Sequence, residues 1–206
     1  KRPVSMLSFA LNHYFAGSFD DSTPYKLTNL IIHITNGLLI FWLTYLIFQR
    51  LTQLNHGNAF QSIVNNRTSI LIATAVALLW LIHPIQLTSV LYVVQRMTAL
   101  SALFVLLGLI LFLKGRVRMI SGRRNGAWLI LIGLFGCGML GALSKENGVL
   151  LPAFMLVLEL ALFSGEQPWT AWHRQTRNSK RALLLAITAI GSMTLVAVIN
   201  YALPNY

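Results

Sequence analysis

The feature that most constrains this chain is a series of apolar runs, most of them about long enough to cross a lipid bilayer. A helix needs about 20 mainly apolar residues to span the hydrocarbon core. Only 10% of the 206 residues are charged, whereas soluble domains carry about 25%. The sequence therefore predicts an all-α polytopic transmembrane bundle of about six spans, organised as a single domain over residues 1–206. The expected spans are residues 30–48, 69–85, 97–113, 126–143, 149–163 and 182–203.

The N-terminal segment, residues 1–25, is too polar to be a span. Val4, Leu7, Leu11 and Phe15 recur at helical spacing, which is typical of an amphipathic helix. We expect this helix to lie in the membrane interface, over the outer ends of the spans. Because the chain starts at Lys1 without a signal-peptide pattern, we expect it to be a fragment of a longer protein.

The distribution of lysine and arginine predicts the orientation. When the spans alternate, eleven of these residues fall on one side, mainly in the loops 49–68, 114–125 and 164–181, and five fall on the other. The positive-inside rule makes the first side cytoplasmic. In a membrane protein the net charge of +11 is explained by topology and by contact with anionic lipid, and it does not indicate nucleic-acid binding. We expect an integral membrane protein with its polar site on the outer side.

Several polar residues lie together near the outer ends of the spans. The stretch 78–100, LLWLIHPIQLTSVLYVVQRMTAL, joins two apolar runs through a turn that carries His83, Gln95 and Arg96. Lys145 and Glu146 occupy a second outer turn, SKENG at 144–148. Ionisable groups at membrane depth are costly, and by default they indicate a functional site.

Each candidate has a functional and a structural interpretation. Arg96 is predicted to hold a phosphate with its guanidinium, assisted by Lys145 and His83, but Arg96 could equally extend to lipid headgroups. His83 could end a helix, and Lys145 and Glu146 could form a surface ion pair. The supporting candidates are His33, which could simply pack against a neighbouring helix, together with Gln95, Glu146 and Arg2.

The acidic residues give only weak catalytic candidates. Asp20 and Asp21 lie on the predicted outer side but could form no more than a polar turn. Glu159 lies near the cytoplasmic end of its span, where it could extend to the membrane interface or contact a neighbouring helix. The sequence contains no HExxH, no CxxC and no glycine-rich phosphate loop, so no metal site is predicted and no cofactor is indicated.

Four segments in order resemble a known family. They are RPVSMLSFALNHYFAG, YKLTNLIIHITNGLL, LLWLIHPIQLTSVLYVVQRMTALSALFVLLGLILFL and LSKENGVLLPAFMLVLEL, within residues 2–160. Together they resemble the membrane region of GT-C-type glycosyltransferases that carry C-terminal tetratricopeptide repeats, the group of transmembrane protein O-mannosyltransferases and their bacterial relatives.

The resemblance implies transfer of a sugar from a polyprenyl-phosphate carrier to an acceptor, expected to be a protein, on the outer face. The third and fourth segments resemble the bacterial branch more closely, which implies a bacterial inner membrane with the site facing the periplasm. The resemblance also implies a catalytic acid in a first outer loop upstream of Lys1, with Asp20 or Asp21 as second choices, and repeats beyond Tyr206. One position departs from the family, because Thr88 stands where the eukaryotic relatives carry a glutamate. This departure favours binding by the 83–96 turn over acid–base chemistry. Metal dependence is left open.

Two other functions are compatible with the same residues. A transporter or flippase for a lipid-linked sugar would also use outer basic residues, although Glu159 is the only charge expected inside the cytoplasmic halves of the spans. A non-catalytic scaffold for a repeat domain is the second alternative, and the clustering of outer polar residues argues against it.

The predicted orientation can be tested with single cysteines and a membrane-impermeant thiol reagent. Gly122→Cys, in the cytoplasmic loop, should stay unlabelled in intact cells. Cysteines in the turns 83–87 and 144–148 should be labelled from outside. Labelling of Gly122→Cys from outside, or protection of both turns without burial, would contradict the arrangement.

Overall fold

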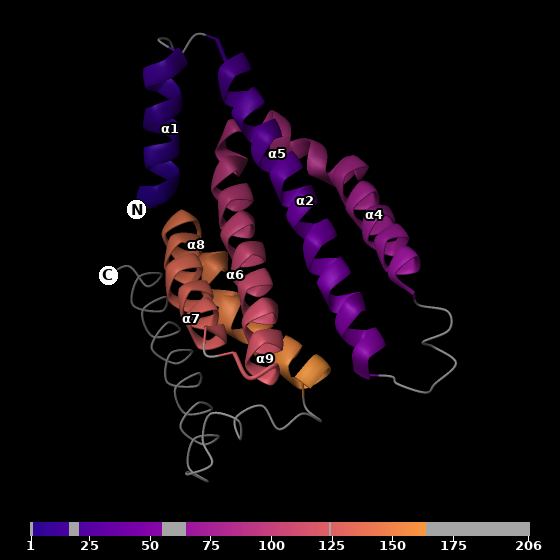
Figure 1. Cartoon of the computed structure of the whole chain (residues 1–206). Coiled ribbons are helices and arrows are strands. Elements are labelled where there is room, and N and C mark those ends of the chain that lie inside the picture. Colours follow the sequence, from indigo (N-terminus) through magenta and orange to yellow (C-terminus); the bar gives the residue numbers. More distant parts are fainter. Residues whose placement is uncertain (1, 17–20, 55–64, 124, 164–206) are drawn as a thin grey trace, which may run out of the picture.

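The structure is a computed structural model, and it describes residues 2–16, 21–54, 65–123 and 125–163. In these ranges the chain forms a bundle of helices (Figure 1). These ranges contain helices and no strand, so the prediction of an all-α bundle is confirmed for them. The predicted sixth span at 182–203, together with Lys1 and Asp20, lies outside the described residues.

The order of the helices is as follows (Figure 1). The elements are α1 (Pro3–Ala16), α2 (Thr23–Leu54), α4 (Asn66–Ile82), η1 (Pro84–Gln86), α5 (Leu87–Leu91), η2 (Val93–Gln95), α6 (Arg96–Ile120), α7 (Gly126–Leu131), η3 (Ile132–Cys137), α8 (Gly138–Ser144), η4 (Glu146–Leu150) and α9 (Leu151–Phe163). Helix α2 packs against both α4 and α6, and α6 in turn packs against α7, η3 and α8. Helix α1 packs against the ends of α8, α2 and α6.

Four stretches of the described chain are long and apolar enough to cross a membrane, and the bent pair formed by α4 and the η1–α5 segment would make a fifth. The chain is therefore an integral membrane protein. The four stretches are Thr23–Leu54, Val93–Ile120, Gly126–Ser144 and Glu146–Phe163.

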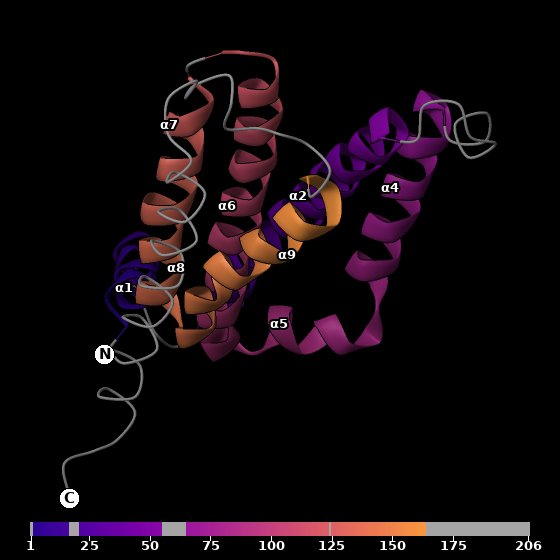
Figure 2. The ribbon, with the colours of Figure 1, turned by 90° about the horizontal axis from the view of Figure 1, so that it is seen from below.

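The second predicted span does not continue straight to residue 85. Helix α4 ends at Ile82, and the chain bends by 54° into η1 and α5. Proline has no N–H to donate, and its ring pushes the preceding residue out of the helical region. His83 accordingly has an extended ψ of 129°, and its ring accepts the N–H of Ile85. Figure 2 shows α5 running across from the end of α4 toward α6.

Helix α6, which contains the third predicted span, is longer than the apolar run at residues 97–113. Helix α6 continues to Ile120, so Lys114, Arg116 and Arg118 lie on its last two turns and not in a loop. In this extension Arg116 forms an ion pair with Glu159 of α9. Of the two interpretations of Glu159, the contact between helices is therefore the one that the structure shows.

Glycines allow α6 and α8 to approach their neighbours closely. A Cβ on Gly133 would lie 3.0 Å from the Gly108 carbonyl oxygen, and one on Gly148 would lie 2.1 Å from the carbonyl carbon of Gly141. Small residues at helix contacts are the usual means of close packing in membranes. The contact between Gly141 and Gly148 fixes the sharp turn between α8 and η4, and this turn carries Lys145 and Glu146.

A pair of glycine substitutions tests this packing. Gly148→Ala should lower the free energy of unfolding by about 1–3 kcal/mol, because the new methyl group meets backbone that cannot move aside. Gly136→Ala is the matched control, since its nearest neighbour would be a methyl group of Ile132 at 3.8 Å. Thermal unfolding in detergent measures both. Equal stability of the two variants would show that Gly148 and Gly141 can move apart without loss of stability.

Candidate functional site

The polar side of α1 faces the bundle and its apolar side faces outward. Ser5 is fully buried, and its hydroxyl donates to the Ser144 carbonyl at 2.9 Å. Leu7, Leu11 and Phe15 are 51–81% exposed. In water this arrangement would be unfavourable, but it suits a helix whose outer surface contacts lipid. Its orientation relative to the membrane plane stays a prediction.

Arg96 connects α1, α2 and α6. It opens α6 and is fully buried. Its Nε donates to Asn29 Oδ1 at 2.8 Å, its Nη2 to Asn12 Oδ1 at 2.7 Å and to the Tyr25 carbonyl at 2.9 Å, and its Nη1 to the Ser8 carbonyl at 3.2 Å. Burial of an unpaired guanidinium is very costly, so these acceptors are what make its position possible.

The environment of Arg96 also bears on its predicted role. Its guanidinium carbon lies 4.6 Å from the centre of the Phe9 ring, which closes the site from the α1 side. Because the guanidinium is fully buried, a phosphate could reach it only if the side chains around it moved. Binding of phosphate by Arg96 therefore stays a prediction, and the described contacts give this residue a role in holding α1 in place.

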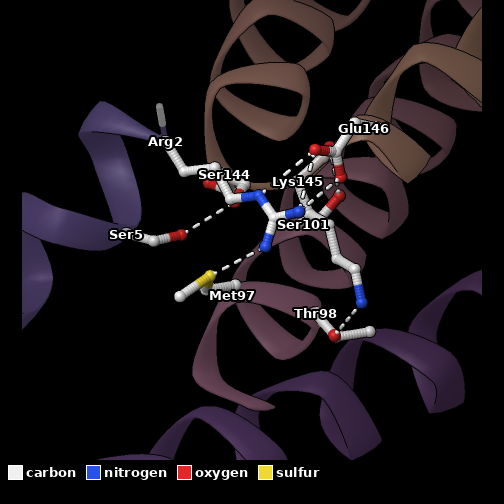
Figure 3. A network of polar contacts seen from close by, with 8 residues as sticks. All are labelled: Arg2, Ser5, Met97, Thr98, Ser101, Ser144, Lys145 and Glu146. Atoms are coloured by element: carbon white, nitrogen blue, oxygen red, sulfur yellow. Dashed lines mark hydrogen bonds and ion pairs between the residues drawn. The ribbon is translucent and has the colours of Figure 1, made fainter. Parts of the chain in front are cut away.

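A second set of polar side chains lies at the N-terminal end of α1, and we call it the Lys145 cluster (Figure 3). Lys145 Nζ donates to Thr98 Oγ1 at 2.7 Å, and the Thr98 hydroxyl donates to Gln95 Oε1 at 3.0 Å. Arg2 forms a two-pronged ion pair with Glu146, with a shortest distance of 2.8 Å. The cluster consists of Arg2, Gln95, Thr98, Lys145 and Glu146.

The Lys145 cluster is accessible, in contrast to Arg96. The side chains of Arg2 and Glu146 are 36% and 41% exposed, and Lys145 is half-buried. The cluster carries two cationic groups and one carboxylate, so one positive charge is left over. An ammonium group with one hydrogen bond to Thr98 retains two N–H donors. The arrangement can therefore bind an anion from the open side.

The two candidate histidines lie outside this cluster. His83 is exposed, and its Nδ1 accepts the Ile85 N–H at 3.2 Å in the α4–η1 corner. His33 is buried on α2, where its Nε2 lies 3.1 Å from the Leu81 carbonyl oxygen and its ring stacks on Trp80 at 4.8 Å. Both contacts are those of helix-packing residues, and neither links a histidine to Arg96 or Lys145.

Asp21 lies near the other end of α1. Its carboxylate accepts the Thr23 N–H at 2.8 Å, and hydrogen bonds from the Thr23 side chain and backbone hold the pKa of this carboxyl below its usual value. Two contacts place it relative to α1: Ser5 touches the α8 end at Ser144, whereas Tyr25, four residues after Asp21, contacts His13. Asp21 and Lys145 are therefore separated by much of the length of α1.

Sequence reasoning missed the amides that hold this end of the bundle together. Asn29 binds Arg96 and the carbonyls of Val90 and Tyr92, and Asn36 donates to the Ala99 carbonyl at 3.0 Å. The signal was present, because Tyr25, Asn29, His33 and Asn36 recur every three or four residues in an otherwise apolar helix. Among the described residues, no three His, Cys, Asp or Glu side chains come together as a possible metal site.

The role of Arg96 in fixing α1 can be tested by hydrogen exchange. Arg96→Met removes the donors and keeps most of the side-chain volume, leaving buried acceptors on Asn12 and Asn29 unpaired. Each unpaired group should cost about 1–3 kcal/mol, so amide exchange in α1 should become faster. Arg67→Met, at an exposed arginine of α4, is the control. Unchanged protection of α1 in Arg96→Met would show that other contacts hold this helix.

Comparison with known proteins gives three related sequences. The chain is 28% identical over 149 residues to human protein O-mannosyl-transferase TMTC4, a match that covers 72% of this chain and 19% of the human protein. It is 27% identical over 175 residues to Drosophila melanogaster protein O-mannosyl-transferase Tmtc3, covering 84% of this chain and 18% of the fly protein. The mouse protein O-mannosyl-transferase TMTC4 is 26% identical over 150 residues.

Other comparisons add no further relatives. No family model matches the chain, and no solved structure matches it. The match covers less than a fifth of the length of the curated relatives. The chain is therefore distantly similar to protein O-mannosyl-transferases, in agreement with the resemblance seen in its sequence segments.

Proposed function

We propose that this chain is part of a membrane glycosyltransferase that moves a sugar from a polyprenyl-phosphate donor to a hydroxyl group of a protein acceptor. The observation that carries the proposal is the similarity to protein O-mannosyl-transferases over 72–84% of the chain. The name of these relatives makes mannose the first sugar to assay. The helical membrane architecture agrees with a lipid-linked donor whose chain lies among the spans.

The proposed reaction takes place at the α1 end of the bundle, on the periplasmic side. The charge distribution supports this orientation, since six of the ten lysine and arginine residues in the described part of the chain lie at the opposite end. The acceptor oxygen attacks the anomeric carbon, the bond from that carbon to the phosphate oxygen breaks, and its electron pair goes to the phosphate. A carboxylate takes the proton of the acceptor hydroxyl.

Lys145 is the described residue best placed to bind the donor phosphate. Its ammonium group is half-buried and accessible, and it is oriented by Thr98. Charge builds up on the leaving phosphate during transfer, and a fixed cation at that position lowers the barrier. Arg2 adds a second cation at the same opening, shared with Glu146. Arg96 positions α1 beside this opening through Asn12 and Ser8.

Substitution of Lys145 tests the proposal. Lys145→Gln should lower the rate of sugar transfer by about 10²–10³, if the contact is worth as much as one donor to a developing anion. Lys145→Arg keeps the charge and should retain more of the activity. The measurement is transfer rate against donor concentration in the full-length protein in membranes. Arg67→Gln, which removes one charge at the opposite end, should behave as wild type.

The result separates the candidate functions. Wild-type kinetics for Lys145→Gln would exclude Lys145 from the donor site. A wild-type protein that moves lipid-linked sugar across the bilayer without transferring it would instead be a flippase. A protein with neither activity would be the scaffold.

Asp21 can be tested without disturbing the turn it forms. Asparagine accepts the same N–H bond in such turns but cannot act as a base. We expect Asp21→Asn to keep transfer within about two-fold of wild type, because Asp21 lies far along α1 from Lys145 and its lowered pKa makes it a weak base. A loss of 100-fold or more at unchanged stability would assign Asp21 as the catalytic base.

A further inference from the structure

The helical stretch that leads to the Lys145 turn contains one π turn. Helices α7 and α8 form a single apolar stretch, Gly126–Ser144, and η3 lies between them. In η3 the N–H of Gly138 reaches the carbonyl of Gly133, five residues earlier, whereas an α-helix bonds each N–H to the carbonyl four residues earlier. A π turn therefore holds one more residue than an α-helical turn. Such turns are rare and are frequent at functional sites.

Before the π turn, this stretch and α6 stay in step. A Cβ on Gly126 would lie 2.5 Å from the Gly115 carbonyl oxygen, and a Cβ on Gly133 would lie 3.0 Å from the Gly108 carbonyl oxygen. Each helix thus covers seven residues between the two contacts. Seven residues make about two α-helical turns, so both contacts fall on the same face of each helix.

Across the π turn, the two helices cover different numbers of residues. A Cβ on Gly133 would lie 3.2 Å from Leu111 Cβ, and a Cβ on Gly141 would lie 3.6 Å from Phe104 Cβ. The step is again seven residues on α6, from Leu111 to Phe104, but it is eight residues from Gly133 to Gly141. In a regular α-helix, eight residues would turn Gly141 about 80° away from α6. The π turn takes up the eighth residue and keeps Gly141 against α6.

We propose that the π turn positions Lys145 for ligand binding by keeping α8 in register with α6. Two contacts just beyond Gly141 depend on this register (Figure 3): the Ser101 hydroxyl donates to the Lys145 carbonyl at 3.4 Å, and Lys145 Nζ donates to Thr98 Oγ1 at 2.7 Å. A shift of one residue would move the turn by about 1.5 Å along the helix and about 100° around it. The consequence for sugar transfer rests on the proposed function, whereas the register does not.

A deletion and an insertion in the full-length protein test this proposal. Deletion of Gly136, an exposed residue of the π turn, shortens the step from Gly133 to Gly141 to seven residues, which a regular α-helix matches to α6. Insertion of one alanine after Gly136 lengthens the same step to nine residues. The deletion should therefore replace the π turn by an α-helical turn and leave Lys145 in place, whereas the insertion should move Lys145 off Thr98.

Pairs of cysteines report which residue faces α6, because a disulfide requires Cβ atoms about 3.5–4.5 Å apart. Phe104→Cys is combined in turn with Leu140→Cys, Gly141→Cys and Ala142→Cys, in a Cys137→Ala background and with wild-type numbering kept in all variants. Mass spectrometry of oxidised membranes identifies the linked peptides. The rate of sugar transfer is measured for the deletion and the insertion without the added cysteines.

Each outcome decides the proposal. Position 104 should link to 141 in the wild type and in the deletion variant, and to 140 in the insertion variant. Transfer should be retained in the deletion variant and should fall by about 10²–10³ in the insertion variant, as for Lys145→Gln. A link from 104 to 142, or no link, in the deletion variant overturns the proposal, because the π turn would then not serve to take up the additional residue.

The insertion variant gives the second decision. A link from 104 to 141 in that variant, or wild-type transfer together with the shifted link to 140, also overturns the proposal, because the register would then not control the position of Lys145. Absence of transfer in the wild type would contradict the proposed function instead, and the links would still decide the register.

Discussion

The buried guanidinium of Arg96 is the group on which the α1 end of this bundle depends. A charge in that position is tolerated only if its N–H groups are satisfied. The acceptors come from two helices, Asn12 and Ser8 of α1 and Asn29 and Tyr25 of α2, and they surround the first residue of α6. The pairing is therefore a condition for this arrangement of α1. The pairing also explains why α1 turns its polar side toward the protein, since Ser8 and Asn12 on that side accept hydrogen bonds from Arg96.

The polar residues at the α1 end differ in how accessible they are. Arg96 is fully buried and makes four hydrogen bonds within the protein, whereas Lys145 and the pair of Arg2 and Glu146 remain partly open. A residue that must meet a ligand has to keep unused donors at an open position, and a residue that holds helices together has to use its donors within the protein. The glycine contact between Gly141 and Gly148 brings the Lys145 turn close enough to α6 for Thr98 to orient the lysine.

The sequence predicted the class of fold and the end of the bundle where polar groups gather, because apolar run length and the positions of charged residues in those runs are local properties. It did not predict the function of each group. Arg96 and Lys145 look alike as basic residues at the ends of spans, and only the packing of Asn12 and Asn29 distinguishes them. The ion pair of Arg116 near the end of α6 was missed for a similar reason, since its partner Glu159 lies more than forty residues later.

The two buried arginines of α6 differ in one respect that bears on ligand binding. Arg116 is paired with a carboxylate, so its charge is cancelled locally. Arg96 makes four hydrogen bonds to amide and carbonyl oxygens, which are neutral, so its positive charge remains. Charges in a poorly solvated environment act over longer distances than charges in water. Of these two buried guanidiniums, Arg96 is therefore the one whose positive charge no carboxylate of the described residues offsets.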